Sequence, residues 1–166
     1  MGSFISLIPT PAEHVEFFFE LAPVSADDVV YDLGSGDGRL VFAAIEHGAG
    51  KAVGVELNPE HVASSRKKAK EMGQENRVEF INADVMDVDL SSATVVFCYL
   101  ITAASIALRP KFEAELKPGT RVVMESFPVP DWEPDQVITR AYKTLYLYRM
   151  PPKIDVNYKK GLPAAV

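Results

Sequence analysis

The chain has 166 residues, of which 48% are hydrophobic and 24% are charged, which are the proportions of one folded globular domain. Its formal net charge of −6 argues against a general nucleic-acid-binding protein, because contacts to phosphates need a basic surface. Its one cysteine, Cys98, excludes an internal disulfide and suits a reducing cytoplasm, where we expect the protein to act.

The first part of the chain alternates between helix and strand patterns. Thr10-Pro11-Ala12-Glu13 has the pattern of a capping box with proline at the first helical position, and predicts a helix after it. The short apolar run 29–33 runs into glycines and predicts a buried strand. Residues 39–47 predict a helix that Gly48 ends, and residues 52–56 predict the second strand.

The same alternation continues in the second part. Asn58 and Pro59 predict the start of a charged helix that ends near Met72. The longest uncharged run, 94–108, is shorter than the roughly 20 residues that a membrane-crossing helix needs, so we expect no membrane segment. The other predicted elements are strands at 78–82, 95–100 and 121–126, a helix at 103–116 with a break near Pro110, and an antiparallel pair at 136–139 and 144–149.

Alternating strands and helices predict an α/β fold with a largely parallel sheet and helices on both faces. We expect one domain over residues 1–166, with a cover and a helix in residues 1–22 and a tail in residues 150–166. In such sheets ligands bind at the carboxyl ends of the strands, so the residues that follow each strand are the candidates for a site.

The segment from Asp32 to Arg39, after the first strand, holds three glycines and two acids. Gly34 and Gly36 allow a tight turn and a close approach of the backbone to a ligand. A dinucleotide loop would have its third glycine at position 39, and the carboxylates of Asp32 and Asp37 would repel a pyrophosphate. A ligand with an ammonium and a sulfonium suits two acids better, so the loop favours S-adenosylmethionine over NAD.

Two further acids follow the next strands. Glu56 ends the second strand, where a carboxylate can accept hydrogen bonds from both hydroxyls of a ribose. Asp84 follows the third strand and can accept from an adenine amino group, while the backbone N–H of Val85 reaches a ring nitrogen. Asp87 is the alternative for this role.

These motifs resemble the successive cofactor motifs of class I, seven-β-strand S-adenosylmethionine-dependent methyltransferases. Pro9-Thr10-Pro11, the strand at 95–100 and the segment from Phe127 to Trp132 are similar to a narrower group. That group comprises the small archaeal broad-specificity protein-lysine methyltransferases and the mitochondrial lysine methyltransferases of the ATP synthase c subunit and the adenine nucleotide translocase. The resemblance covers about residues 9–149.

The resemblance implies a Rossmann-like, doubly wound, mostly parallel seven-stranded sheet with an antiparallel last strand. It also implies S-adenosylmethionine as the cofactor, with the methionine part at the glycine loop, the ribose at Glu56 and the adenine at Asp84. The implied cofactor-binding residues are Pro9, Thr10, Asp32, Gly34, Ser35, Gly36, Asp37, Glu56, Asp84 and Val85.

Two aromatic residues are implied on the acceptor side. Tyr99, near the end of the fourth strand, would face the methyl group, and Trp132 would wall the substrate entrance; core packing is the alternative for both. The implied reaction is an in-line attack by a neutral lysine amine, for which the protein positions and desolvates the reactants. Glu125 and Asp131 are candidates for a general base on position alone.

We expect the partners to be proteins with exposed lysines, basic ones above all, and we expect a monomer that binds neither nucleic acid nor membrane. No metal site is expected, because His14, His47 and His61 lie in separate segments without ligand spacing. The alternatives are a methyltransferase for a small molecule or RNA, a cofactor-binding module without activity, and a dinucleotide-dependent oxidoreductase, against which Arg39 argues.

Overall fold

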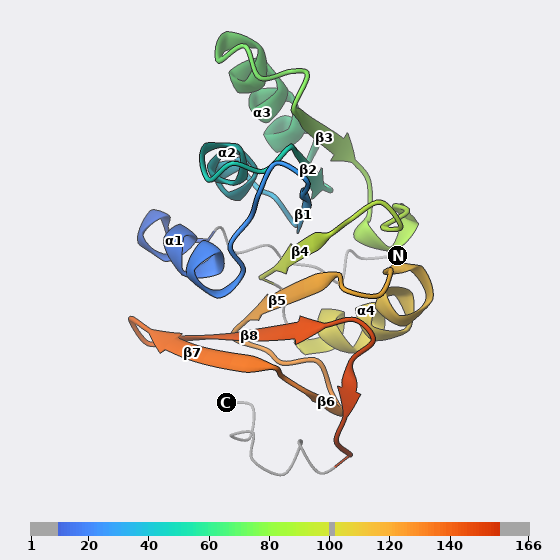
Figure 1. Ribbon diagram of the computed structural model, residues 1–166. Coiled ribbons are helices and arrows are strands. Elements are labelled where there is room, and N and C mark those ends of the chain that lie inside the picture. The colour runs from blue at the N-terminus through green and yellow to red at the C-terminus, as the bar shows by residue number, and fades with distance from the viewer. Residues whose placement is uncertain (1–9, 100–101, 157–166) are drawn as a thin grey trace.

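A computed structural model describes residues 10–99 and 102–156 (Figure 1). A seven-stranded sheet in the order β3-β2-β1-β4-β5-β8-β7 lies at its centre, and β6 pairs with β9 in a separate ribbon. The strands are β1 Val29–Leu33, β2 Lys51–Glu56, β3 Val78–Asn82, β4 Val95–Cys98, β5 Arg121–Glu125, β6 Trp132–Glu133, β7 Gln136–Arg140, β8 Lys143–Arg149 and β9 Lys153–Ile154.

Strands β1 to β5 run parallel, and β8 lies antiparallel between β5 and β7. The β7–β8 hairpin turns at Ala141 and Tyr142, whose φ angles of 46° and 65° match the turn that follows the right-handed twist of paired strands. The mostly parallel seven-stranded sheet with an antiparallel last strand is therefore confirmed.

Helices cover both faces of the sheet (Figure 1). Residues of α1 (Ala12–Leu21), α2 (Arg39–Glu46) and α3 (Pro59–Glu71) share one buried cluster with the strands. The second cluster contains residues of α4 (Thr102–Glu115) and of the short 3-10 helix η1 (Val85–Asp87). Neighbouring strand residues alternate between the two clusters, because successive side chains of a strand point to opposite faces.

The predicted start of α1 is wrong by one residue. The helix begins at Ala12 and is preceded by Pro11, with no side-chain capping hydrogen bond. Thr10 is buried, and its carbonyl oxygen accepts a hydrogen bond from Arg39, so Thr10 lies against the rest of the protein instead of capping the helix. The predicted caps of α3 and α2 are confirmed, because Asn58 accepts from the Glu60 N–H at 2.9 Å and Gly48 follows α2 with φ of 100°.

The break predicted near Pro110 is also wrong, since α4 continues through this residue. Proline removes one backbone N–H and crowds the preceding turn, but packing can outweigh that cost. Leu108 and Phe112, on either side of Pro110, are fully buried against the sheet. The tertiary contacts of the helix therefore override the local preference.

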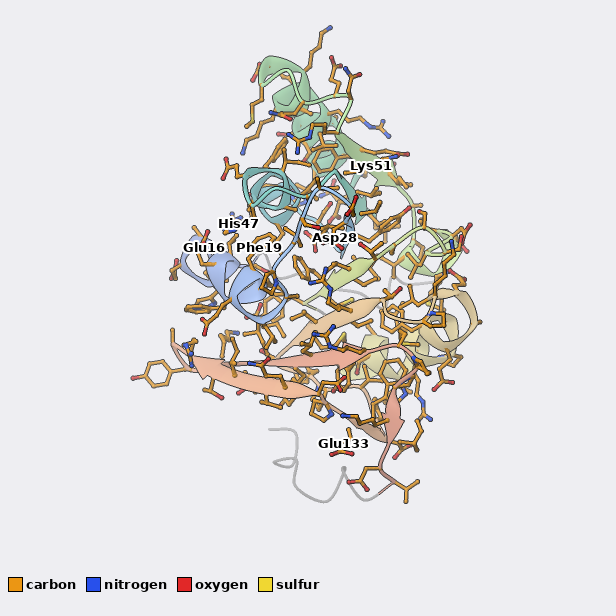
Figure 2. All side chains as sticks on the ribbon, in the orientation of Figure 1. Glu16, Phe19, Asp28, His47, Lys51 and Glu133 are labelled. Carbon is orange, nitrogen blue, oxygen red and sulfur yellow. The ribbon has the colours of Figure 1, made fainter. Side chains whose placement is uncertain are left out.

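Helices α1 and α2 are joined by an aromatic contact (Figure 2). The rings of Phe19 and His47 stack with centroids 4.1 Å apart, and His47 Nε2 lies 3.1 Å from a carboxylate oxygen of Glu16. At the amino ends of the parallel strands, Asp28 joins the starts of β1, β4 and β5. It accepts hydrogen bonds from Thr94 at 2.7 Å and from Arg121 at 2.8 Å. Among the described helices, none has the length and apolar character that crossing a membrane requires.

Candidate active site

The candidate site lies at the carboxyl edge of the parallel strands. Strand β1 has β2 on one side and β4 on the other, and the chain leaves β1 toward β2 and β3 before it crosses to β4 and β5 (Figure 1). Such a reversal of strand order opens a crevice at the carboxyl ends, where α/β sheets bind ligands. The residues at this edge are the glycine loop at 34–38, Glu56, Asp84, Tyr99 and Glu125.

The glycine loop has one open side. Gly34, Gly36 and Gly38 have φ angles of 91°, 53° and 79°, the left-handed region that side chains disfavour. A Cβ atom at Gly38 would lie 2.8 Å from the Phe80 ring, whereas a Cβ atom at Gly36 would meet nothing within 4 Å. Gly38 therefore serves packing, and Gly36 is the position where a ligand can approach the backbone.

Glu56 is the side chain that joins β2 to the glycine loop. It is 2% exposed, and its two oxygens accept from the N–H groups of Gly36 and Asn58, each at 2.8 Å. A carboxylate offers about four lone-pair sites, so roughly two remain for hydrogen bonds to a ligand. The carboxylate therefore has the capacity to accept from the two hydroxyls of a ribose while it holds the loop.

Asp32 is a buried acid in a negative environment. Burial raises the pKa of Asp32 to about 8, with a further contribution from the nearby carboxylates of Glu56 and Asp37. The side chain is therefore mostly protonated at neutral pH, and a cationic ligand group beside it would favour the ionised form. The arrangement fits an ammonium better than a phosphate.

Arg39 links the glycine loop to the N-terminal segment. Its guanidinium donates to both carboxylate oxygens of Asp37, at 2.9 and 2.6 Å, and to the Thr10 carbonyl oxygen at 2.7 Å. Hydrogen bonding from Arg39 holds the pKa of Asp37 below its usual range. No local pattern signals the contact with Thr10, because it joins residues 29 positions apart. Pro9 lies outside the described residues.

Ser35 and Asp84 carry structural contacts of their own. The Ser35 hydroxyl is buried against β2, where a Cβ atom at Gly54 would come within 2.6 Å of it. Asp84 caps η1 by accepting from the Met86 N–H at 2.9 Å, and Val85 is buried. The proposed adenine contacts of Asp84 and Val85, and the choice between Asp84 and Asp87, stay predictions.

The two aromatic candidates fall in different environments. Tyr99 follows β4 at the carboxyl edge, and its hydroxyl accepts from Lys143 Nζ at 2.8 Å. Trp132 is fully buried, between Phe112 and Tyr148, and its indole N–H donates to Glu113 at 3.1 Å. These contacts favour core packing, the alternative given for Trp132, and its role at the substrate entrance stays a prediction.

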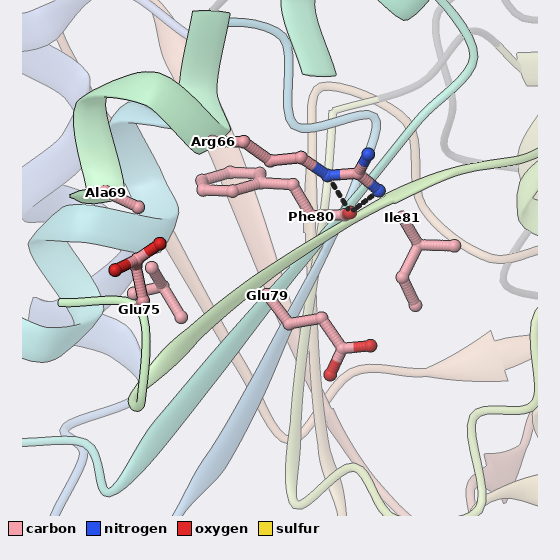
Figure 3. Close-up of a pocket in the computed structure, with 7 residues that line it drawn as sticks. Arg66, Ala69, Glu75, Glu79, Phe80 and Ile81 are labelled. Carbon is pink, nitrogen blue, oxygen red and sulfur yellow. Dashed lines mark hydrogen bonds between the residues drawn. The ribbon is translucent and has the colours of Figure 1, made fainter. Parts of the chain in front are cut away.

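A pocket of 470 Å³ lies elsewhere, on the outer edge of β3 (Figure 3). Arg66 of α3 crosses it and donates to the Phe80 carbonyl oxygen at 3.0 and 2.6 Å. Its lining contains no residue of the glycine loop, so it lies apart from the candidate site. The Arg66 contact occupies a backbone acceptor of the edge strand β3, which helps to protect that edge from pairing. In the described part of the chain, no three His, Cys, Asp or Glu side chains are grouped so that they could hold a metal ion.

Residues 32–136 match the family model of the ANTKMT methyltransferase domain. The chain is 42% identical over 149 residues to a protein-lysine N-methyltransferase of Saccharolobus islandicus (strain REY15A), with 87% of this chain and 92% of the relative covered. It is 33% identical over 144 residues to the lysine N-methyltransferase of the ATP synthase c subunit from Homo sapiens, with 87% of this chain covered. The chain spans 61% of the length of the human protein.

A solved structure is also similar over nearly the whole fold. It is described as an RNA methyltransferase from Salinibacter ruber in complex with S-adenosyl-L-homocysteine. The TM-score is 0.83 at 44% sequence identity, with 89% of this chain and 97% of that chain covered.

Proposed function

Because the chain belongs to the ANTKMT methyltransferase domain family, we propose that it transfers methyl groups from S-adenosylmethionine to lysine side chains of proteins. The observation that carries the cofactor assignment is Glu56, which binds the Gly36 N–H at the open side of the glycine loop and keeps acceptor capacity for a ligand. The names of the archaeal and human relatives support lysine as the acceptor.

In this proposal the cofactor lies along the carboxyl edge of β1, β2 and β3. Asp32 and the backbone at Gly36 bind the methionine part, Glu56 binds the ribose, and Asp84 with Val85 binds the adenine. Arg39 holds Thr10 beside the loop as part of a cover over the cofactor. Asp37 acts through its pair with Arg39, since that pair already engages its carboxylate.

The protein contributes position and desolvation to the reaction. S-adenosylmethionine supplies a methyl group that its positive sulfur already activates. Buried side chains around β1 and β4 exclude water, which favours the neutral form of an amine over the ammonium. Tyr99 lies at this edge and contacts a lysine ammonium of the protein itself, so it is placed to orient an acceptor amine.

We propose basic proteins as the preferred acceptors, because the net charge of −6 attracts a positively charged partner. A cytoplasmic location accords with a buried and unpaired Cys98. A monomer stays our proposal for the assembly, and sedimentation of the purified protein tests it.

RNA is the second candidate acceptor. The observation that favours it is the description of the Salinibacter ruber protein as an RNA methyltransferase, and the acidic charge balance argues against it. The test incubates the protein with isotope-labelled S-adenosylmethionine, a panel of basic proteins and a panel of short RNAs. Label on lysine side chains supports the proposal, and label on RNA alone overturns it.

A further inference from the structure

Glu125 ends β5 with unused hydrogen-bonding capacity. It is fully buried, and neither of its carboxylate oxygens accepts a hydrogen bond from a described residue. The buried Nδ1 atom of His14 lies 3.8 Å from one of these oxygens and makes no hydrogen bond to a described residue either. Buried polar atoms normally have partners, because an unmet donor or acceptor costs free energy. This pair therefore points to a ligand.

The surroundings of Glu125 already hold a lysine ammonium. Lys143 Nζ lies 3.9 Å from Glu125 Oε1, 2.8 Å from the Tyr99 hydroxyl and 4.8 Å from the centre of the Tyr99 ring. Carboxylate, hydroxyl and aromatic ring are the groups that bind an ammonium, and the ring also tolerates a methylated one. The cluster thus has the chemistry that an acceptor lysine needs.

The cluster lies at the same edge as the glycine loop. In the sheet, Cys98 of β4 pairs with Leu33 of β1 and with Met124 of β5. Tyr99 and Glu125 each come one residue later, so Tyr99 emerges beside β1, which carries the glycine loop, and Glu125 emerges one strand further along the same edge. An acceptor amine bound there would lie on the side of the sheet edge opposite to Glu56, which is two strands away from β4.

We propose that Glu125 is a catalytic residue that binds the ammonium of the acceptor lysine and takes its proton, with the acceptor replacing Lys143 beside Tyr99. The inference rests on the proposed lysine methyltransferase function. The ammonium gives one proton to the carboxylate of Glu125 and becomes a neutral amine. The amine lone pair then forms the N–C bond as the C–S bond breaks and its electron pair returns to sulfur. The products are a methylammonium and a neutral thioether.

The proton affinity of Glu125 suits this step. Burial raises the pKa of Glu125, and the charge of Lys143 lowers it only in part. Among the described residues, His14 from α1 and Lys143 from β8 face the Glu125 carboxylate at 3.8 and 3.9 Å, and Tyr99 after β4 contacts that lysine. Asp131, the other candidate base, is paired with Arg109 at 2.8 Å and serves as the matched control.

The first test compares wild type, Glu125→Gln and Asp131→Asn on poly-L-lysine with labelled S-adenosylmethionine. We expect Glu125→Gln to lower kcat/KM at pH 7 by about 10²–10⁴-fold, the usual contribution of a general base. The difference in kcat/KM between Glu125→Gln and wild type should narrow as pH approaches about 10, where a substantial fraction of lysine is already neutral without a base. Asp131→Asn should keep wild-type kcat/KM, and S-adenosylhomocysteine binding by calorimetry should be unchanged in both variants. A deficit of Glu125→Gln that is under about threefold, or constant with pH, overturns the inference.

The second test uses the partly exposed Lys143, which can be replaced even if the buried Glu125→Gln variant does not fold. If the ammonium of Lys143 and that of the acceptor lysine compete for the position beside Tyr99 and Glu125, Lys143→Gln should lower the KM for poly-L-lysine by at least about threefold at low salt. An unchanged or raised KM contradicts the competition. Failure of the proposed function looks different, because wild type itself would then leave poly-L-lysine unlabelled.

Discussion

Glu56 combines two tasks in one side chain, because the carboxylate that holds the glycine loop also faces the ligand edge. We predict that Glu56→Gln weakens S-adenosylhomocysteine binding by about 1–3 kcal/mol. The amide would present N–H groups to one of the two backbone donors that the carboxylate binds, and it removes a charged acceptor. Calorimetry measures the loss, and thermal unfolding checks that the variant is folded. An unchanged dissociation constant in a folded variant would remove Glu56 from the site.

The protonated state of Asp32 leads to the prediction that ligand binding releases a proton. Its pKa of about 8 means that it is mostly protonated in the free protein at pH 6–7, and a ligand ammonium beside it lowers that pKa. Binding of S-adenosylhomocysteine at pH 6–7 should therefore release up to about one proton, and affinity should rise with pH toward 8. Calorimetry in buffers of different ionisation enthalpy measures the release. Asp32→Asn should abolish it; binding without proton release in wild type would contradict the assignment.

Helix α4 contains a proline whose cost in helix stability is offset by the packing of its neighbours against the sheet. Pro110 is exposed and lies inside the helix, where it removes a backbone donor. We predict that Pro110→Ala raises the free energy of unfolding by about 1–3 kcal/mol. Urea denaturation provides the measurement, and Ala107→Pro on the same helix is the matched control that should lower stability. Equal stability of Pro110→Ala and wild type would mean that the helix bears no cost at this residue.

In the segment after β5, Trp132 contributes to the core. Trp132 packs between α4 and β8, so Trp132→Ala should lower the free energy of unfolding by about 3–5 kcal/mol. Trp132→Phe should lose less stability and keep kcat/KM on poly-L-lysine. A large fall in kcat/KM for a Trp132→Phe protein of unchanged stability would return this residue to the acceptor site.

At the scale of the whole molecule, the acidic charge should speed encounter with basic acceptors. The net charge of −6 acts over a distance of about 10 Å at 0.1 M salt, and salt screens it. We predict that kcat/KM on poly-L-lysine falls several-fold between about 0.02 and 0.2 M salt. A neutral peptide with one lysine is the control and should change little. Equal salt dependence of both acceptors would exclude steering by the protein's charge.

Local patterns in the sequence determine most of the helices and strands, and they identify the glycine loop and Glu56 in the candidate site. The strands at 29–33 and 78–82 were predicted with the bounds they have, because apolar runs between turn residues leave few other conformations. The glycine loop and Glu56 were predicted because tight turns demand glycine and because strand ends gather at one edge of a parallel sheet. Their contact through the Gly36 N–H follows from that shared edge.

Only the tertiary structure decided which distant residues meet. Glu125, His14, Tyr99 and Lys143 come from four separate segments, and no local spacing relates them. The sequence does not predict the contact of Arg39 with Thr10 or the continuation of α4 through Pro110, and it leaves the burial of Trp132 as one of two alternatives, for the same reason. Sequence patterns report the preferences of neighbouring residues, whereas burial and long-range hydrogen bonds depend on the packing of the whole chain and can exceed those preferences.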